Sequence, residues 1–401
     1  MPLMFLLSDV ALAENWPGWR GPRGDGTSNE KNVPVKWSPT QNVLWKTPVP
    51  GKGHASPIVW ENHIFVVTAS EEQKQRILLC LDRKDGKILW QRVVLEAPLE
   101  RINRLNSYAS STPATDGERV YVSFLDNDKM FIAAYDFEGN NLWEVRPGAF
   151  ASMHGYCSSP VIYKDKLIVN GDHDGSSYIV ALDRTTGKTI WKTPRPNKTR
   201  SYCTPIIRRI GQRNQMILSG TMCVASYDPD TGKQHWIIDG PTEQFVASIV
   251  YNGELLFMTC GFPKHFIQAI RPDGHGNVTD THVLWQKDKD CSYVPSPIAF
   301  GPYFLIVSDP GIATCFEAKT GKSLWREKLG RHNSASLVSA DGLVYFLSDE
   351  GAMTVVKPGQ ELDIVARNEL GENTYASPAI SNGQFFIRAD KHLYCIGTGK
   401  N

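Results

Sequence analysis

The stretch SPVIYKDKLIVNGDHDGSSYIVALDRTTGKTIW, residues 159–191, decides the fold of this chain. Its β-branched and aromatic residues form three runs, at 161–163, 167–169 and 178–183, with polar turn residues between them. This is the pattern of short strands joined by turns. Residues 184–188 have the composition of a tight turn in which glycine adopts a positive φ. A fourth strand begins at 189, so the stretch predicts a four-stranded antiparallel unit.

The same unit recurs along the whole chain. A Ser-Pro, Thr-Pro or Ala-Ser pair opens each of eight repeats, at 56, 112, 159, 204, 247, 296, 335 and 377. Seven tryptophans recur toward the repeat ends at intervals of roughly 45 residues, and they are Trp45, Trp90, Trp143, Trp191, Trp236, Trp285 and Trp325. Four strands per repeat of this length make a propeller blade. The sequence therefore predicts one all-β, eight-bladed β-propeller.

The two ends of the chain are complementary pieces of one repeat. The last repeat, from 377 to 396, has three strands and no tryptophan, whereas 42–46 has a fourth strand without the first three. We expect the N-terminal strand to complete the last blade, which removes the open sheet edges. The predicted organisation is a truncated signal peptide over 1–13, an extension over 14–41 and the propeller over 42–398.

The recurring tryptophans predict a docking role between blades. We expect each on an outer strand, and four of them follow a turn of the Asp-x-x-Thr-Gly-Lys type, as in 183–191 and 228–236. An indole there can pack flat across the neighbouring blade and donate its N–H to a backbone carbonyl. We expect the seven residues to lock blade to blade.

The start of the chain and its charge bound the location and the partners. Residues 3–7 are apolar, and Ala11-Leu12-Ala13 matches the small-x-small pattern of a signal cleavage site, although Asp9 interrupts the apolar run and no basic residue precedes it. We expect a periplasmic or secreted protein. No other apolar run is long enough for a membrane span. With 43 basic and 42 acidic residues, the chain has no field that would favour nucleic acid. We expect a monomer.

The repeat resembles the tryptophan-docking repeat of PQQ-type propellers. These include the pyrrolo-quinoline quinone (PQQ) dependent dehydrogenases and the outer-membrane assembly lipoprotein family. The segment 16–22, Trp-Pro-Gly-Trp-Arg-Gly-Pro, is similar to the opening of secreted bacterial PQQ-like propellers. The resemblance covers about residues 16 to 398 and implies the fold. It leaves the function open, because one fold hosts many functions.

A candidate ligand funnel lies where the chain passes from one blade to the next. The residues just before the repeat starts crowd the channel mouth, and they are His54, Tyr108, Tyr156, Tyr202, Phe245, Tyr293, Asn333 and Tyr375. The adjoining loops add Arg101, Arg104, His154, Arg200, Arg331 and His332. Tyrosine offers stacking area at low entropy cost, and arginine seeks acidic groups. The alternative is that the tyrosines seal a tapering ring by packing alone.

The residues bear on two possible cofactors, PQQ and Ca²⁺. PQQ dehydrogenases hold the quinone with a stacked tryptophan, a disulfide of adjacent cysteines and a Ca²⁺ bound by Glu and Asn, and an Asp is the base. The eight cysteines include no adjacent pair, and no tryptophan falls among the channel-mouth positions. The acidic loops 171–175 and 126–128 could supply oxygen ligands to Ca²⁺, yet Asp and Asn are also ordinary turn residues. We expect no bound metal or cofactor, with PQQ and calcium as alternatives.

The function that the sequence favours is a non-catalytic exported scaffold. It would bind a peptide, a polysaccharide or a cell-envelope protein through the channel-mouth face. The alternatives are a PQQ-dependent oxidoreductase and an outer-membrane assembly factor. Because the cofactor holders of the dehydrogenases are not evident, the sequence assigns no catalytic residue.

Overall fold

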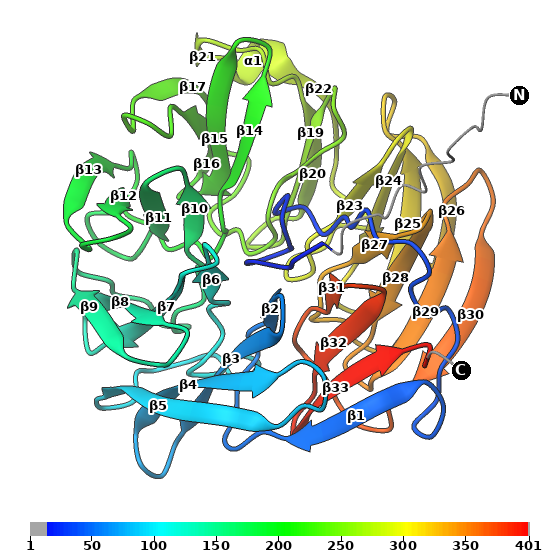
Figure 1. The fold of residues 1–401 in the computed structure, drawn as a ribbon. Helices are drawn as coiled ribbons and strands as arrows, with labels where there is room; N and C mark the ends of the chain where they lie inside the picture. Colours follow the sequence, from blue (N-terminus) through cyan, green and yellow to red (C-terminus); the bar gives the residue numbers. More distant parts are fainter. Residues whose placement is uncertain (1–13, 400–401) are drawn as a thin grey trace, which may run out of the picture.

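The computed structural model describes residues 14–399, and its strands form eight antiparallel sheets arranged as blades around one axis (Figure 1). The predicted all-β eight-bladed propeller is confirmed. The predicted signal peptide lies outside the described residues. Within residues 14–399, no helix has the length and apolar character needed to cross a membrane.

We number the blades in chain order, and the first strand of each is the innermost. Blade 1 holds β2 (Ile58–Trp60), β3 (His63–Ser70), β4 (Gln75–Asp82) and β5 (Ile88–Glu96). Blade 2 holds β6 (Ala114–Thr115), β7 (Arg119–Asp126), β8 (Lys129–Asp136) and β9 (Asn141–Val145). Blade 3 holds β10 (Val161–Tyr163), β11 (Lys166–Gly171), β12 (Tyr178–Asp183) and β13 (Thr189–Pro194). Blade 4 holds β14 (Ile206–Ile210), β15 (Arg213–Gly220), β16 (Cys223–Tyr227) and β17 (Gln234–Asp239).

The remaining blades follow the same order. Blade 5 holds β18 (Val250–Tyr251), β19 (Leu256–Cys260), β20 (Phe266–Ile270) and β22 (Val283–Lys287). Blade 6 holds β23 (Ile298–Phe300), β24 (Tyr303–Val307), β25 (Ile312–Glu317) and β26 (Ser323–Lys328). Blade 7 holds β27 (Val338–Ala340), β28 (Leu343–Leu347), β29 (Ala352–Lys357) and β30 (Asp363–Glu369). Blade 8 holds β31 (Ala379–Ser381), β32 (Gln384–Arg388), β33 (His392–Gly397) and β1 (Val43–Pro48).

The middle strands are apolar on both faces because each blade lies between two others. The six central residues of β3 are all buried, and so are those of β4. The fourth strands face solvent on one side and alternate, as β1 and β13 do. A blade packed between two others is therefore recognised in the sequence by continuous apolar runs in its middle strands and an alternating pattern in its fourth strand.

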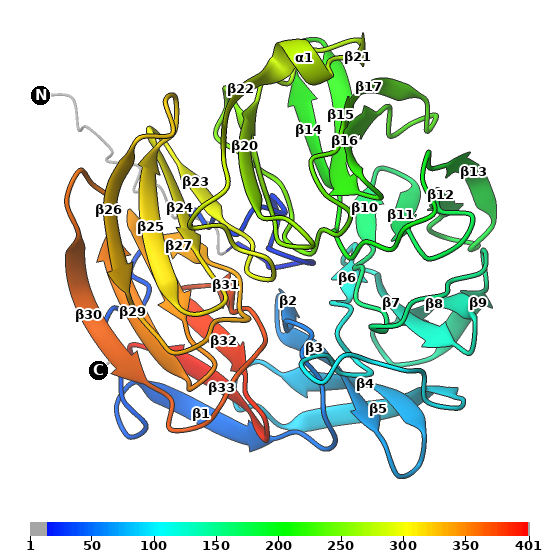
Figure 2. The same ribbon diagram turned by 180° about the vertical axis from the view of Figure 1, so that it is seen from behind.

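The N-terminal strand closes the ring, as the sequence predicted. β1 pairs antiparallel with β33, with Trp45 opposite Cys395 and Pro48 opposite His392. Figure 2 shows β1 along the outer edge of blade 8, beside blade 1. The closing strand therefore joins the two ends of the propeller sequence, around Pro48 and His392.

Most of the recurring tryptophans contact the next blade in one way. Six of the seven indoles donate their N–H to a backbone carbonyl of the following blade, and the acceptors are Arg83, Phe137, Arg184, Pro229, Ala318 and Gly359. The indole lies against the turn between the third and fourth strands of that blade. Gly187 shows why the turn carries glycine: its φ is +71°, and a Cβ there would lie 2.7 Å from the Trp143 ring.

Trp236 is the exception, because blade 5 lacks the usual turn. Residues 271–282 replace it and contribute β21 (Gly276–Asn277), which pairs parallel with β17, and α1 (Thr279–His282). Trp236 is fully buried, and its Nε1 donates to Oε1 of Gln215 in its own blade. The Gln215 amide nitrogen in turn donates to the carbonyl of Pro272. In the other blades with such a tryptophan, the indole N–H bonds directly to a backbone carbonyl of the next blade, whereas here the Gln215 side chain bridges the indole and that carbonyl.

We predict that Gly187→Ala destabilises the protein more than Gly342→Ala. Both residues have a positive φ, +71° and +78°, so both substitutions bring backbone strain of about 1–2 kcal/mol. A methyl group at 187 also meets the Trp143 indole, whereas nothing lies within 4 Å of one at 342. Overpacking of this kind typically adds about 1–3 kcal/mol. Urea denaturation of the two variants measures the difference, and equal loss would contradict the role of this turn in docking.

Candidate functional site

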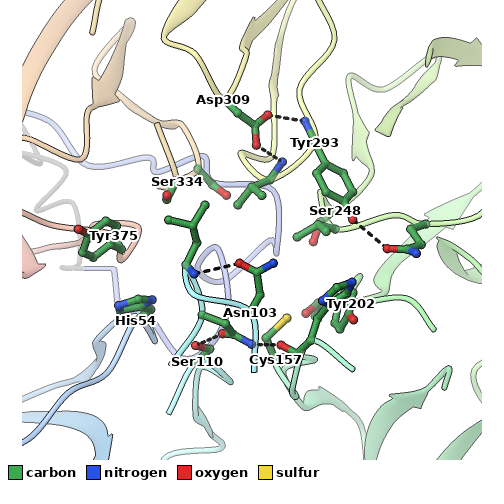
Figure 3. A pocket seen from close by; sticks show the side chains of 18 of the residues that line it. His54, Asn103, Ser110, Cys157, Tyr202, Ser248, Tyr293, Asp309, Ser334 and Tyr375 are labelled. Carbon is green, nitrogen blue, oxygen red and sulfur yellow. Dashed lines mark hydrogen bonds between the residues drawn. The ribbon is translucent and has the colours of Figure 1, made fainter. Parts of the chain in front are cut away.

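A cavity of about 550 Å³ opens at one end of the ring, where each fourth strand passes to the next inner strand (Figure 3). We call this cavity the cup. Its wall comes from residues near the inner-strand starts, from the loops before them, and from the loops between the second and third strands of blades 5 and 6. The volume lies within the range of small-molecule sites. The lining includes His54, Asn103, Leu105, Asn106, Ser110, Met153, His154, Cys157, Arg200, Tyr202, Gln244, Phe262, Tyr293, Asp309, His332, Ser334 and Tyr375.

Hydroxyl residues at the repeat starts form a ring around the cup. At six of the eight blade junctions, the backbone N–H of one repeat's Ser or Thr donates to the hydroxyl of the next, at 2.8 to 3.2 Å. Five residues of this ring line the cavity, and they are Ser159, Thr204, Ser248, Ser336 and Ser377. The Ser-Pro pairs that mark the repeats therefore connect the inner strands. In the sequence these pairs served only to mark the repeats. Their recurrence was the one sign that they could also connect neighbouring blades.

Three of the five predicted tyrosines line the cup. The Tyr202 hydroxyl is 2.9 Å from Ser152 Oγ, and that of Tyr293 donates to Gln244 Oε1 at 3.1 Å. Tyr375 packs against His54 with ring centroids 4.7 Å apart. These contacts fix the rings, so they present preformed aromatic surface.

Tyr108 and Tyr156 do not line the cup. Tyr156 is only 4% exposed, and its hydroxyl donates to Ser123 within blade 2. Tyr108 lies under the Arg76 guanidinium, 5.7 Å from its ring centroid. The loop between blades 1 and 2 instead contributes Asn103, Leu105 and Asn106 to the lining. The expectation that all five tyrosines share one funnel is wrong in this respect.

The predicted cationic rim is mostly outside the cup or already paired. Arg101, Arg104 and Arg331 are exposed and do not line the cavity. Arg200 does, but its Nη1 contacts both Asp174 carboxylate oxygens, at 2.8 and 2.9 Å. His332 lines the cup with its Nδ1 2.6 Å from Asp349. The cup therefore offers little uncompensated positive charge.

The other ionisable groups of the cup have shifted pKa values. Burial lowers the pKa of His54 to about 4, so its imidazole is neutral near pH 7. Burial and then Arg200 lower the pKa of His154. Burial raises the pKa of Asp309, although the backbone N–H groups of Tyr293 and Val294 donate to its carboxylate. Burial also raises the pKa of the Cys157 thiol to about 12, which keeps it protonated.

Trp19, from the N-terminal extension, is a cup residue that sequence reasoning missed. It lines the cavity, and its Nε1 donates to Ser248 Oγ at 3.0 Å. The expectation that no tryptophan reaches the channel mouth is therefore wrong. The residue lies outside the repeats, so repeat positions could not place it, and the 16–22 motif was the only signal.

The two acidic loops bind arginines. Asp172 pairs with Arg195 in a fully buried ion pair at 3.0 Å, and Asp126 pairs with Arg146 at 2.7 Å. Together with the Asp174–Arg200 pair, these contacts give the carboxylates a structural partner. In the described part of the chain, no three His, Cys, Asp or Glu side chains gather as metal ligands.

A metal-bound quinone does not fit the residues of the cup. Trp19 and Asp309 are of the types that PQQ dehydrogenases use for stacking and as a base. A glutamate ligand and adjacent cysteines are missing from the lining, and the cysteines between residues 14 and 399 are all free thiols. The lining has asparagines, Trp19 and Asp309, but it lacks the glutamate that would complete the metal site and the disulfide that would cover the ring.

These features define a closed propeller with a small central cavity at one end. The family model described as outer membrane protein assembly factor BamB, with the PQQ_2 repeat, matches residues 27–124, 73–248, 223–360 and 309–398. The chain belongs to this family.

Similar proteins include both assembly factors and dehydrogenases. A polyvinylalcohol dehydrogenase of Sphingopyxis sp. (strain 113P3) is 21% identical over 75% of this chain, and the chain spans less than half the length of the curated relatives it matches. BamB from Moraxella catarrhalis superposes with a TM-score of 0.63, 13% identity, and coverage of 88% of this chain and 99% of its own. Quinohemoprotein alcohol dehydrogenase from Comamonas testosteroni gives 0.67 and 12%, with 96% and 81% covered. At these identities the solved structures show the fold.

Proposed function

We propose that this propeller is a binding protein whose cup takes a neutral, hydroxyl-rich polymer, of which a polysaccharide is the natural example. The observation that carries the proposal is the chemistry of the lining. Aromatic rings, hydroxyls and amides surround a cavity whose charges are paired or suppressed. Among the ligand classes that the sequence left open, this lining favours a polysaccharide over a peptide or an envelope protein.

The charge of the lining disfavours an ionic ligand. Arg200 is neutralised by Asp174, and the pKa shifts of His54 and His154 disfavour their charged forms. Desolvating a charged ligand here would be costly without a partner for its charge. A neutral ligand avoids that penalty.

The hydroxyl ring supplies donors to such a ligand. Ser159, Thr204 and Ser377 each accept a backbone N–H, but within residues 14–399 their hydroxyls donate no hydrogen bond. A hydroxyl carries one donor beside its acceptor lone pairs. These donors match the hydroxyl oxygens of a polyol.

The mouth of the cup suits the carbon skeleton of the same ligand. Leu105, Met153 and Phe262 line the cavity while 43%, 40% and 49% exposed. Exposed apolar groups at a cavity are a mark of ligand contact. Apolar groups at the mouth and hydroxyls deeper in match a chain with both C–H faces and O–H groups.

The names of two relatives support the proposal. Both are polyvinylalcohol dehydrogenases, and polyvinyl alcohol is a neutral, hydroxylated polymer. The segment 11–13 supports export, so we place the protein in the periplasm or outside the cell.

We predict that Tyr375→Ala weakens binding of a neutral polymer by up to about tenfold, because an aromatic contact of about 0.5–1.5 kcal/mol is lost and about 1.4 kcal/mol is tenfold. The probes are polyvinyl alcohol and pullulan, titrated by calorimetry. Tyr163→Ala is the matched control, because Tyr163 bonds Asp230 away from the cup. Unchanged affinity in Tyr375→Ala, or binding of charged peptides only, would contradict the proposal.

The oxidoreductase alternative has its own test. The protein is incubated with PQQ and Ca²⁺, and quinone absorbance and dye reduction with an alcohol are measured. Binding without either signal agrees with the proposal, whereas stoichiometric quinone uptake with dye reduction would replace it with alcohol oxidation.

A further inference from the structure

The N-terminal extension occupies the end of the ring opposite the cup. Trp16 exchanges backbone hydrogen bonds with Val59 of β2, and Ser28 and Gly26 bond to Ser339 of β27. Glu30 accepts the backbone N–H groups at 382 and 383, in the turn that follows β31. These positions lie on the inner strands or in the turns after them, away from the repeat starts. Figure 1 shows the segment across the centre of the ring.

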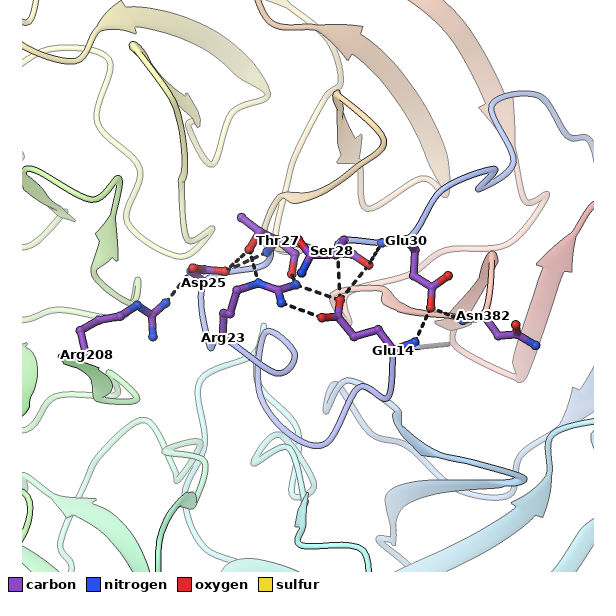
Figure 4. Close-up of polar contacts among 9 residues, drawn as sticks. Glu14, Arg23, Asp25, Thr27, Ser28, Glu30, Arg208 and Asn382 are labelled. Carbon is purple, nitrogen blue, oxygen red and sulfur yellow. Dashed lines mark hydrogen bonds and ion pairs between the residues drawn. The ribbon is translucent and has the colours of Figure 1, made fainter. Parts of the chain in front are cut away.

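Ion pairs hold the segment in place (Figure 4). Arg23 makes two contacts with the Glu14 carboxylate, at 2.6 and 2.8 Å. Asp25 pairs with Arg208 of β14 at 2.7 Å. Contacts thus reach blade 4 on one side of the ring and blades 7 and 8 on the other. We call residues 14–30 the plug.

Buried contacts pin the middle of the plug. Arg20 is 2% exposed, and its guanidinium donates to the carbonyls of Asp25 and Pro297. Trp16 is fully buried and lies over Gly21, where a Cβ would be 2.6 Å from the indole. The close packing leaves no room for a substituent at 21.

The plug also reaches into the cup. Trp19 is partly exposed, and the surface that it exposes includes the cavity lining. Its bond to Ser248 ties the indole to the hydroxyl ring. One segment therefore both fills the far end of the ring and forms the end of the cup.

We propose that the plug makes the cup blind, so that the cup takes the free end of a hydroxylated chain, with the terminal unit against Trp19. This inference rests on the proposed function. A chain cannot pass through the ring while the plug is in place, and an internal stretch would have to fold back on itself to reach Trp19. A free end reaches Trp19 and the hydroxyl ring directly.

The test is the dependence of binding on chain length. Polyvinyl alcohol and pullulan are each titrated at two lengths that differ tenfold. End-on binding counts chain ends, so the Kd expressed as mass concentration rises about tenfold for the longer chain. Binding along the chain counts monomers and leaves that value unchanged, which would overturn the end-on mode while the proposed function stands. No binding of either polymer would overturn both.

Trp19 variants test the floor of the cup. We predict that Trp19→Ala lowers affinity for the shorter chain by tenfold or more, whereas Trp19→Phe keeps most of it because a ring remains. Melting temperatures check that both variants are folded, and Tyr163→Ala is again the control because Tyr163 bonds Asp230 away from the cup. If both variants were folded and both bound the polymer with wild-type affinity, Trp19 would not be the terminal contact.

Discussion

A chain that starts at residue 50 is expected not to fold, whereas one that starts at residue 42 folds. The segment between them is β1, which gives blade 8 its fourth strand. Without β1, β33 becomes an open sheet edge. The hydrogen bond from the Trp45 indole to Arg83 and its packing against Gly86 of blade 1 are also lost. Truncating one such tryptophan typically costs about 3–5 kcal/mol, and the whole stability of a domain is about 5–15 kcal/mol. Together with the loss of the β1–β33 hydrogen bonds, the cost is expected to exceed the stability of the whole domain.

The matched comparison separates closure from the plug. Chains 14–401, 42–401 and 50–401 are compared by circular dichroism melting and size exclusion. The second lacks the whole N-terminal extension, including the plug and the buried Val33 and Trp37, but keeps β1, so its loss of stability measures the extension without the closing strand. A 50–401 protein that is monomeric and melts cooperatively at the temperature of 42–401 would refute closure by β1.

Trp236→Ala is expected to destabilise the ring more than Trp191→Ala. Trp236 is fully buried, whereas Trp191 is partly exposed on Gly232. Truncating a buried tryptophan typically costs about 3–5 kcal/mol. Gln215 keeps a hydrogen bond from Ser226 in the variant, so the loss reports packing rather than an orphaned amide. Urea denaturation followed by circular dichroism measures both variants.

Cooperativity is the second readout of this pair. Because the ring is closed, the loss should appear in one transition of the whole protein. Equal destabilisation by the two variants would contradict the distinction drawn from burial. Two separate transitions, with the larger one unmoved, would contradict docking as the link between blades.

The repeating features of this fold could be read from the sequence because they recur. The strands of blade 3 follow the apolar runs at 161–163 and 178–183 to the residue. The closing strand was evident from what the last repeat lacked. The parts that do not repeat could not be placed this way. α1, β21 and the relay through Gln215 arise from residues 271–282, which replace a turn and have no counterpart in other blades.

The site was predicted only in part, for a related reason. Equivalent repeat positions correctly bring Tyr202, Tyr293 and Tyr375 to one cavity. Tyr156 occupies the same repeat position as these tyrosines, but it points into blade 2, where its hydroxyl donates a hydrogen bond to Ser123. The sequence does not show that Arg200 is paired, because its partner Asp174 lies 26 residues earlier in the chain. Trp19 depends on how a non-repeating segment crosses the ring.

The location of a bound oligomer tests the central claim most directly. A crystal structure of the protein with the shortest polyvinyl alcohol or pullulan oligomer that binds would show it. The account predicts density within the cup, with the chain end against Trp19 and hydroxyls of the oligomer within hydrogen-bonding distance of Ser159, Thr204 or Ser377. An oligomer that is ordered on the outer loops, with no oligomer density in the cup, would contradict the account.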